Sequence, residues 1–217
     1  MSHSSNLRPN NRRLDHPTTG TLVLIMALAL VFYSLPWVVT ASASLNLGAY
    51  DLAEWASLHP AVRASTPPLL VTFVLRLPLV CIAVIGAFGT PITRRWLALL
   101  IVGGISVALL PPELLPTTGN PNSQQQFALA LTALVVGAVG VSGIGGRGRG
   151  GLAALGALIG AAASLIGLAL GTDLMRGFDL PTAVGGGGVA LAGLFGLIGV
   201  RFARGALRRS SVVDQTG

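Results

Sequence analysis

The feature that most constrains this chain is the segment Leu69–Phe88, in which nearly all of the twenty residues are apolar. Twenty apolar residues in an α-helix are long enough to cross the hydrocarbon core of a bilayer. The whole chain has a mean hydropathy of +0.75 and only 10% charged residues, whereas a soluble domain has about 25%. We therefore expect an all-α fold, a polytopic integral membrane protein whose surface contacts the lipid bilayer.

Six apolar segments divide the chain, and each is predicted to form one transmembrane helix. The predicted spans lie near residues 21–40, 69–88, 96–110, 127–144, 152–170 and 183–200. The third is short for a span, and it suffices only if Arg94 and Arg95 reach toward the interface and the helix tilts little. The sequence thus predicts a bundle of about six transmembrane helices in one domain, residues 21–205.

The segments outside the spans are polar. We expect residues 1–20 and 206–217 to be cytoplasmic tails, the first of them basic and disordered, and residues 41–68 to be an outer loop. Asp51 and Glu54 have capping-box spacing and predict a short helix in that loop. A signal peptide is the alternative for the first span, because residues 41–43 fit a small-x-small cleavage site. We favour an uncleaved helix, because the apolar run exceeds the usual length of about 7–15 residues.

The distribution of arginine predicts the orientation in the membrane. All fourteen basic residues are arginine, and eleven of them lie in residues 1–20, in the turns 89–95 and 145–151, and in the C-terminal segment from Arg201 onward. Arg63 and Arg176 are the two in the loops on the other side. The positive-inside rule therefore gives both termini in the cytoplasm, N-in and C-in. The same clustering explains the net charge of +7 without nucleic acid, and the arginine-only, alanine-rich composition favours a multi-pass protein of a bacterial inner membrane.

Small residues recur at every third or fourth position in the last three predicted spans, and 21 of the 29 glycines lie between residues 137 and 205. Such stripes let helix backbones approach closely in lipid. The glycines predicted to pack helices are Gly156, Gly160, Gly167, Gly188 and Gly196. Static packing is the interpretation we favour, and faces that slide during a transport cycle are the alternative.

No residue pattern in the sequence predicts catalysis, a metal site or a cofactor. Residues 140–143 match the GxSG of rhomboid intramembrane proteases, but all three histidines precede Ser142, so the serine has no predicted general base. The GxGxxG at residues 143–148 follows a membrane helix and not the strand that a dinucleotide site requires. Cys81 is the only cysteine, which excludes a cysteine metal cluster. We therefore predict no enzyme.

Arg76 is the best single candidate for a site, because it places a permanent charge inside the second span, two residues before Pro78. A charge at membrane depth is costly and requires an explanation. Arg76 could extend to the outer interface, pair with a carboxylate or face an anionic ligand, and we favour the first of these. The four carboxylates that could pair with it are Asp51, Glu54, Glu113 and Asp173, among which Glu113 and Asp173 are the candidates we prefer.

Two functions fit these features. The first is a non-catalytic membrane component of a small-molecule transport system, which the six spans, the embedded Arg76 and the glycine-lined faces favour. The second is a structural or assembly subunit of a larger membrane complex, such as a bioenergetic one. Short loops and spans without carboxylates favour the second function, because proton- or cation-coupled carriers usually place Asp, Glu or His in a span. Either function implies other membrane subunits or a homo-oligomer as partners.

Overall fold

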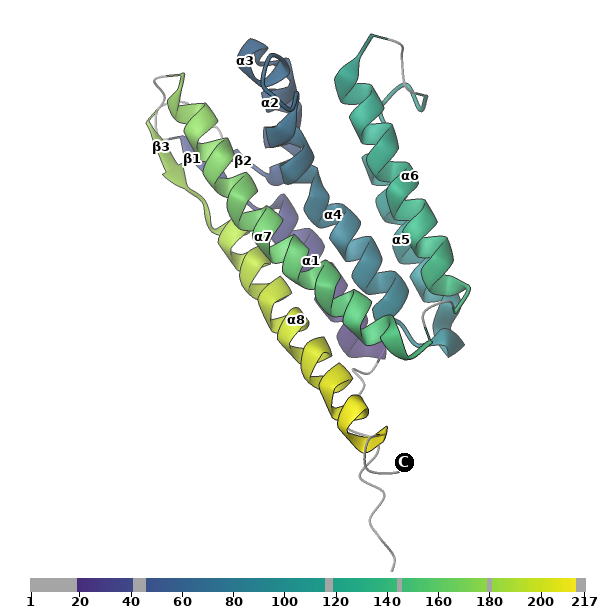
Figure 1. Ribbon diagram of the computed structural model, residues 1–217. Coiled ribbons are helices and arrows are strands. Elements are labelled where there is room, and N and C mark those ends of the chain that lie inside the picture. The colour runs from purple at the N-terminus through teal and green to yellow at the C-terminus, as the bar shows by residue number, and fades with distance from the viewer. Residues whose placement is uncertain (1–18, 41–45, 116–118, 144–145, 179–180, 214–217) are drawn as a thin grey trace, which may run out of the picture.

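The computed structural model describes residues 19–40, 46–115, 119–143, 146–178 and 181–213, which form a bundle of helices (Figure 1). Its long helices are α1 (Thr19–Ser34), α4 (Leu70–Gly89), α5 (Arg95–Leu109), α6 (Pro121–Val141), α7 (Arg149–Arg176) and α8 (Gly186–Val213). Among the described residues, five helices are long and apolar enough to cross a membrane: α4, α5 with the 3₁₀ turn Ile92–Arg94 before it, α6, α7 and α8. The expected all-helical bundle is therefore confirmed, with five candidate spans where six were predicted, because α1 has only 16 residues.

The helix α4 lies at the centre of the bundle. It packs against α7, α6, α5 and α2, and most of its side chains from Leu75 to Phe88 are buried. Figure 1 shows α7 and α8 on one side of α4 and α5 and α6 on the other. The segment around which the sequence prediction was built is thus the helix that the rest of the fold surrounds.

The short elements gather at one end of the bundle, which we call the α2 end (Figure 1). They are the helices α2 (Ala49–Leu58) and α3 (Pro60–Arg63) and the strands β1 (Val38–Thr40), β2 (Asn46–Leu47) and β3 (Thr182–Val184). The strands form an antiparallel sheet in the order β2-β1-β3. This sheet joins the chain after α1 to the chain before α8.

Both helices that flank the sheet are shorter at this end than predicted. The first helix ends at Ser34 and not near residue 40, because Pro36 has no N–H to donate and its ring clashes with the preceding turn. The last helix begins at Gly186, since residues 182–184 pair with β1. Gly185 and Gly187 donate backbone hydrogen bonds to the carbonyls of Trp37 and Pro36 at 2.7 and 3.0 Å.

The glycines predicted to pack helices do not behave alike. A Cβ atom on Gly160 would lie 2.8 Å from Phe195 of α8, and one on Gly156 would lie 2.7 Å from Val84 of α4. Gly167 and Gly188 also face neighbouring side chains, those of Leu75 and Trp37, each at 3.1 Å. The prediction for Gly196 is wrong: nothing lies within 4 Å of its Cβ position, because the face of α8 that packs on α7 does not include it.

Candidate functional site

The Arg76 side chain is completely buried and pairs with Glu54. Its Nη2 atom donates to Glu54 Oε1 at 2.7 Å. The prediction that Arg76 extends to the interface is therefore wrong, because its guanidinium has no exposed surface. The structural reason is that α2 packs against α4 and carries a carboxylate to the charge.

Three amide side chains of α6 complete the site. Arg76 Nη1 donates to Asn122 Oδ1 at 2.7 Å and to Gln125 Oε1 at 3.3 Å. Asn122 Nδ2 donates to Glu54 Oε2 at 3.5 Å, and Gln126 Nε2 donates to Glu54 Oε1. Positions 122, 125 and 126 share one helical face, as residues three and four apart do. We call Arg76, Glu54, Asn122, Gln125 and Gln126 the Arg76 cluster.

Local sequence fixes where these amides lie. Asn120 caps α6 by accepting hydrogen bonds from the backbone N–H groups of Asn122 and Ser123, with Pro121 at the first helical position. Gln125 Nε2 then donates to the carbonyl of Leu69 at 3.1 Å, and Gln125 Oε1 accepts from Thr72 at 2.7 Å. These hydrogen bonds therefore join the start of α6 to the start of α4, next to the second turn of α4, which carries Arg76.

The two charges of the cluster have unequal access to water. The Arg76 side chain has none, whereas the Glu54 side chain is 39% exposed. The Nε atom of Arg76 is buried without a hydrogen-bond partner. Tyr50, one turn before Glu54 on α2, has its pKa raised, chiefly by burial and then by the Glu54 charge, while Arg76 opposes the rise. The cluster is thus a buried cation with a partner at the edge of the bundle.

The two carboxylates that the sequence favoured as partners lie elsewhere. Glu113 is exposed in the turn after α5, and Asp173 forms an exposed pair with Arg176 at 3.5 Å. The choice of Glu113 or Asp173 is therefore wrong. Glu54 is one of the four carboxylates that the sequence offers as a partner, whereas the capping box predicted from its spacing with Asp51 does not form, since the N-cap of α2 is Gly48 and no side chain caps the helix there. No sequence pattern singles out Glu54, because its neighbours on the same face of α2 include the polar residues Asp51 and Ser57.

A second arginine, Arg149, binds helix ends at the opposite end of the bundle. Arg149 donates from Nη2 to the carbonyls of Ala87 and Thr90 at 2.7 and 3.2 Å, and from Nη1 to the carbonyl of Gly140. Its guanidinium also lies 5.6 Å from the centre of the Phe88 ring. Basic side chains commonly bind the unpaired carbonyls at helix C-termini. Arg149 therefore joins the C-terminal ends of α4 and α6.

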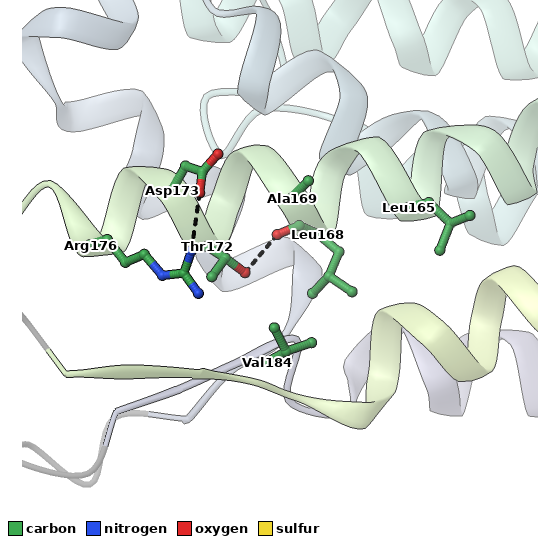
Figure 2. A pocket seen from close by; sticks show the side chains of 7 residues that line it. All are labelled: Leu165, Leu168, Ala169, Thr172, Asp173, Arg176 and Val184. Atoms are coloured by element: carbon green, nitrogen blue, oxygen red, sulfur yellow. Dashed lines mark hydrogen bonds and ion pairs between the residues drawn. The ribbon is translucent and has the colours of Figure 1, made fainter.

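Two surface hollows lie away from the Arg76 cluster. Figure 2 shows the one between α7 and β3, of about 280 Å³, where Arg176 reaches toward Asp173 and the Thr172 hydroxyl donates to the Leu168 carbonyl. The other, of about 320 Å³, is lined by α1, α4 and α5 with apolar residues such as Met26 and Ile101. Neither lining includes a residue of the cluster.

Within the described ranges, no group of three His, Cys, Asp or Glu side chains is placed to hold a metal ion. Comparisons of the chain with protein-family models, curated proteins and solved structures find no match. The fold and the site themselves define the class, a helical bundle with five candidate membrane-spanning helices and a buried ionic cluster near one end.

Proposed function

We propose that this protein is a non-catalytic, multi-pass component of a small-molecule transport system in a bacterial inner membrane. The observation that supports this proposal is the Arg76 cluster. Ionisable side chains inside transmembrane bundles are costly and commonly mark the path of a substrate or ion. Arg76 lies six residues into α4, or about 9 Å along its axis at 1.5 Å per residue. The charge thus lies within the apolar part of the helix, close to its α2 end.

The orientation completes this proposal. In this proposal α1 crosses the membrane as the first of six spans, so the α2 end lies outside and the Arg149 end in the cytoplasm. Arg94, Arg95, Arg201 and Arg204 belong to the Arg149 end, where the positive-inside rule requires them. Solute from outside would then meet Glu54 first, since its carboxylate is partly exposed.

A specific observation favours the second candidate, a structural or assembly subunit of a larger membrane complex such as a bioenergetic one. The groups of the Arg76 cluster largely satisfy one another, and Arg149 closes the other end of the α4–α6 contact. Such a bundle is well suited to serve as a fixed scaffold. Exposed apolar side chains on α5 and α6, such as Leu100 and Leu134, would then contact other subunits or a second copy.

Partner identification and uptake separate the two functions. The tagged protein is purified from native membranes in mild detergent, and copurifying proteins are identified by mass spectrometry. A nucleotide-binding subunit supports transport, whereas subunits of a respiratory or photosynthetic complex support the scaffold. In parallel, membrane vesicles with and without the protein are compared for uptake of a panel of labelled small solutes. Uptake that requires the protein and falls in an Arg76→Gln variant of normal abundance is the expected result; equal uptake in both vesicle types argues against transport.

A further inference from the structure

The carboxylate of Glu54 lies in a ring of donors that belong to other elements. Arg76 Nη2 and Gln126 Nε2 donate to its Oε1 atom, and Asn122 Nδ2 donates to Oε2. We propose that these donors form a carboxylate-binding site, which Glu54 fills in this structure, and that a small free monocarboxylate displaces Glu54 from it. This inference rests on the proposed transport function and names its substrate class.

Glu54 leaves one hydrogen-bond donor of Arg76 unused. The Nε–H and one Nη2–H of a guanidinium point to the same side and together bind both oxygens of a carboxylate. Glu54 occupies only Nη2, and Nε is buried without a partner. A free carboxylate is not tethered to a helix, so it can bind both N–H groups. It therefore gains a hydrogen bond that Glu54 does not make.

Charge decides which solutes can enter. Arg76 is permanently protonated and fully buried, so its charge must stay paired when Glu54 leaves. A neutral or cationic solute would leave the guanidinium unpaired, which is strongly unfavourable at a buried site. Glu54 itself is 39% exposed and lies on a helix of ten residues, so its charge can move into water. The exchange thus replaces one anion by another and changes no buried charge.

The decisive variant is Glu54→Ala, which removes the resident carboxylate and leaves the donors in place. We expect acetate to raise the melting temperature of this variant in detergent in a saturable manner. At about ten times the dissociation constant, binding shifts the folding equilibrium roughly elevenfold, or by about 3–6 °C. Asp51→Ala, an exposed carboxylate removed from the same helix, is the matched control, and it should respond more weakly than Glu54→Ala because acetate must first displace Glu54. The double variant Glu54→Ala/Arg76→Gln should not respond.

Three results would overturn the inference: no acetate effect on Glu54→Ala, an equal effect on the double variant, or stabilisation by phosphate or chloride but not by acetate. If Glu54→Ala does not fold, the wild-type protein decides by hydrogen exchange of residues 49–58. Acetate should increase exchange there relative to chloride, and no increase refutes the displacement. If acetate stabilises Glu54→Ala but the vesicles show no uptake, the proposed transport function is rejected and the carboxylate site is kept. If uptake is seen but acetate does not stabilise Glu54→Ala, the site is rejected and transport is kept.

Discussion

The unequal burial of Arg76 and Glu54 predicts that removing either charge has a different cost. In Glu54→Gln, the guanidinium stays in a place without water and loses its counter-charge. Breaking a buried pair in this way costs about 3–5 kcal/mol. In Arg76→Met, the remaining Glu54 charge is partly hydrated, and the main loss is the donor to Asn122 Oδ1. That loss is worth about 1–3 kcal/mol. The variant that keeps the buried charge should thus be the less stable one.

The double variant Arg76→Met/Glu54→Gln sharpens this prediction. It has no buried charge, so it should be more stable than Glu54→Gln alone, by about 1–3 kcal/mol. Thermal unfolding in one detergent measures all three variants, and 1 kcal/mol corresponds to about 2–4 °C for a chain of this size. Asp173→Asn is the control, because its pair with Arg176 is 3.5 Å long and exposed and should contribute at most about 1 kcal/mol.

Two results would refute the reasoning. If Arg76→Met is less stable than Glu54→Gln, then the buried cation is not the more demanding member of the pair. If the losses of the two single variants simply add in the double variant, then the two side chains do not interact in the folded protein, because independent sites are additive.

Three further predictions follow from the packing and the orientation. Gly160→Leu should unfold the bundle or lower its melting temperature by at least 5–10 °C, on a scale of about 2–4 °C per kcal/mol. The reason is that even a Cβ atom at position 160 would lie against Phe195, whereas Gly196→Leu should be tolerated. Arg149→Gln should cost about 1–3 kcal/mol in thermal unfolding, because it strips donors from helix-end carbonyls. Reporter fusions after residue 150 should report cytoplasm, and fusions after Asn120 the outside.

Each of these has an outcome that contradicts it. Equal melting temperatures for the two glycine variants would show that α8 packs through another face. An Arg149→Gln protein as stable as the wild type would mean that water replaces the guanidinium at the helix ends. A cytoplasmic signal from the Asn120 fusion would exclude a crossing by α5, and with it the six-span arrangement.

The helices were predictable where a single property determines them. The run Leu69–Phe88 became α4 within one residue at each end, because continuous apolarity needs no tertiary information. The start of α6 was missed, since Pro121–Gln126 is polar and resembles a loop. Those polar residues are helical because Asn120 caps them and because the amides meet Arg76 and Glu54. Local pattern cannot show that a polar turn has polar partners on another helix.

The sequence predicted the cation of the candidate site but not its partner. Arg76 stands out in the sequence because its charge interrupts an apolar span. Its partner does not, because the choice among the carboxylates depends on how α2 folds back on α4. Arg149 shows the same limit: nothing in a glycine-rich turn indicates that its arginine will bind carbonyls of Ala87 and Gly140, which come from two other helices.

The strand pairing between β1 and β3 has a consequence for the order of synthesis. Val38 pairs with Val184, which leaves the ribosome about 150 residues later. At roughly 5–20 residues per second, this interval is about 7–30 s. Until then only the pairing of β1 with β2, which follows it by a few residues, can form. The three-stranded sheet is therefore among the last parts of the fold to be completed, after the chain of all the helices before α8 has been made.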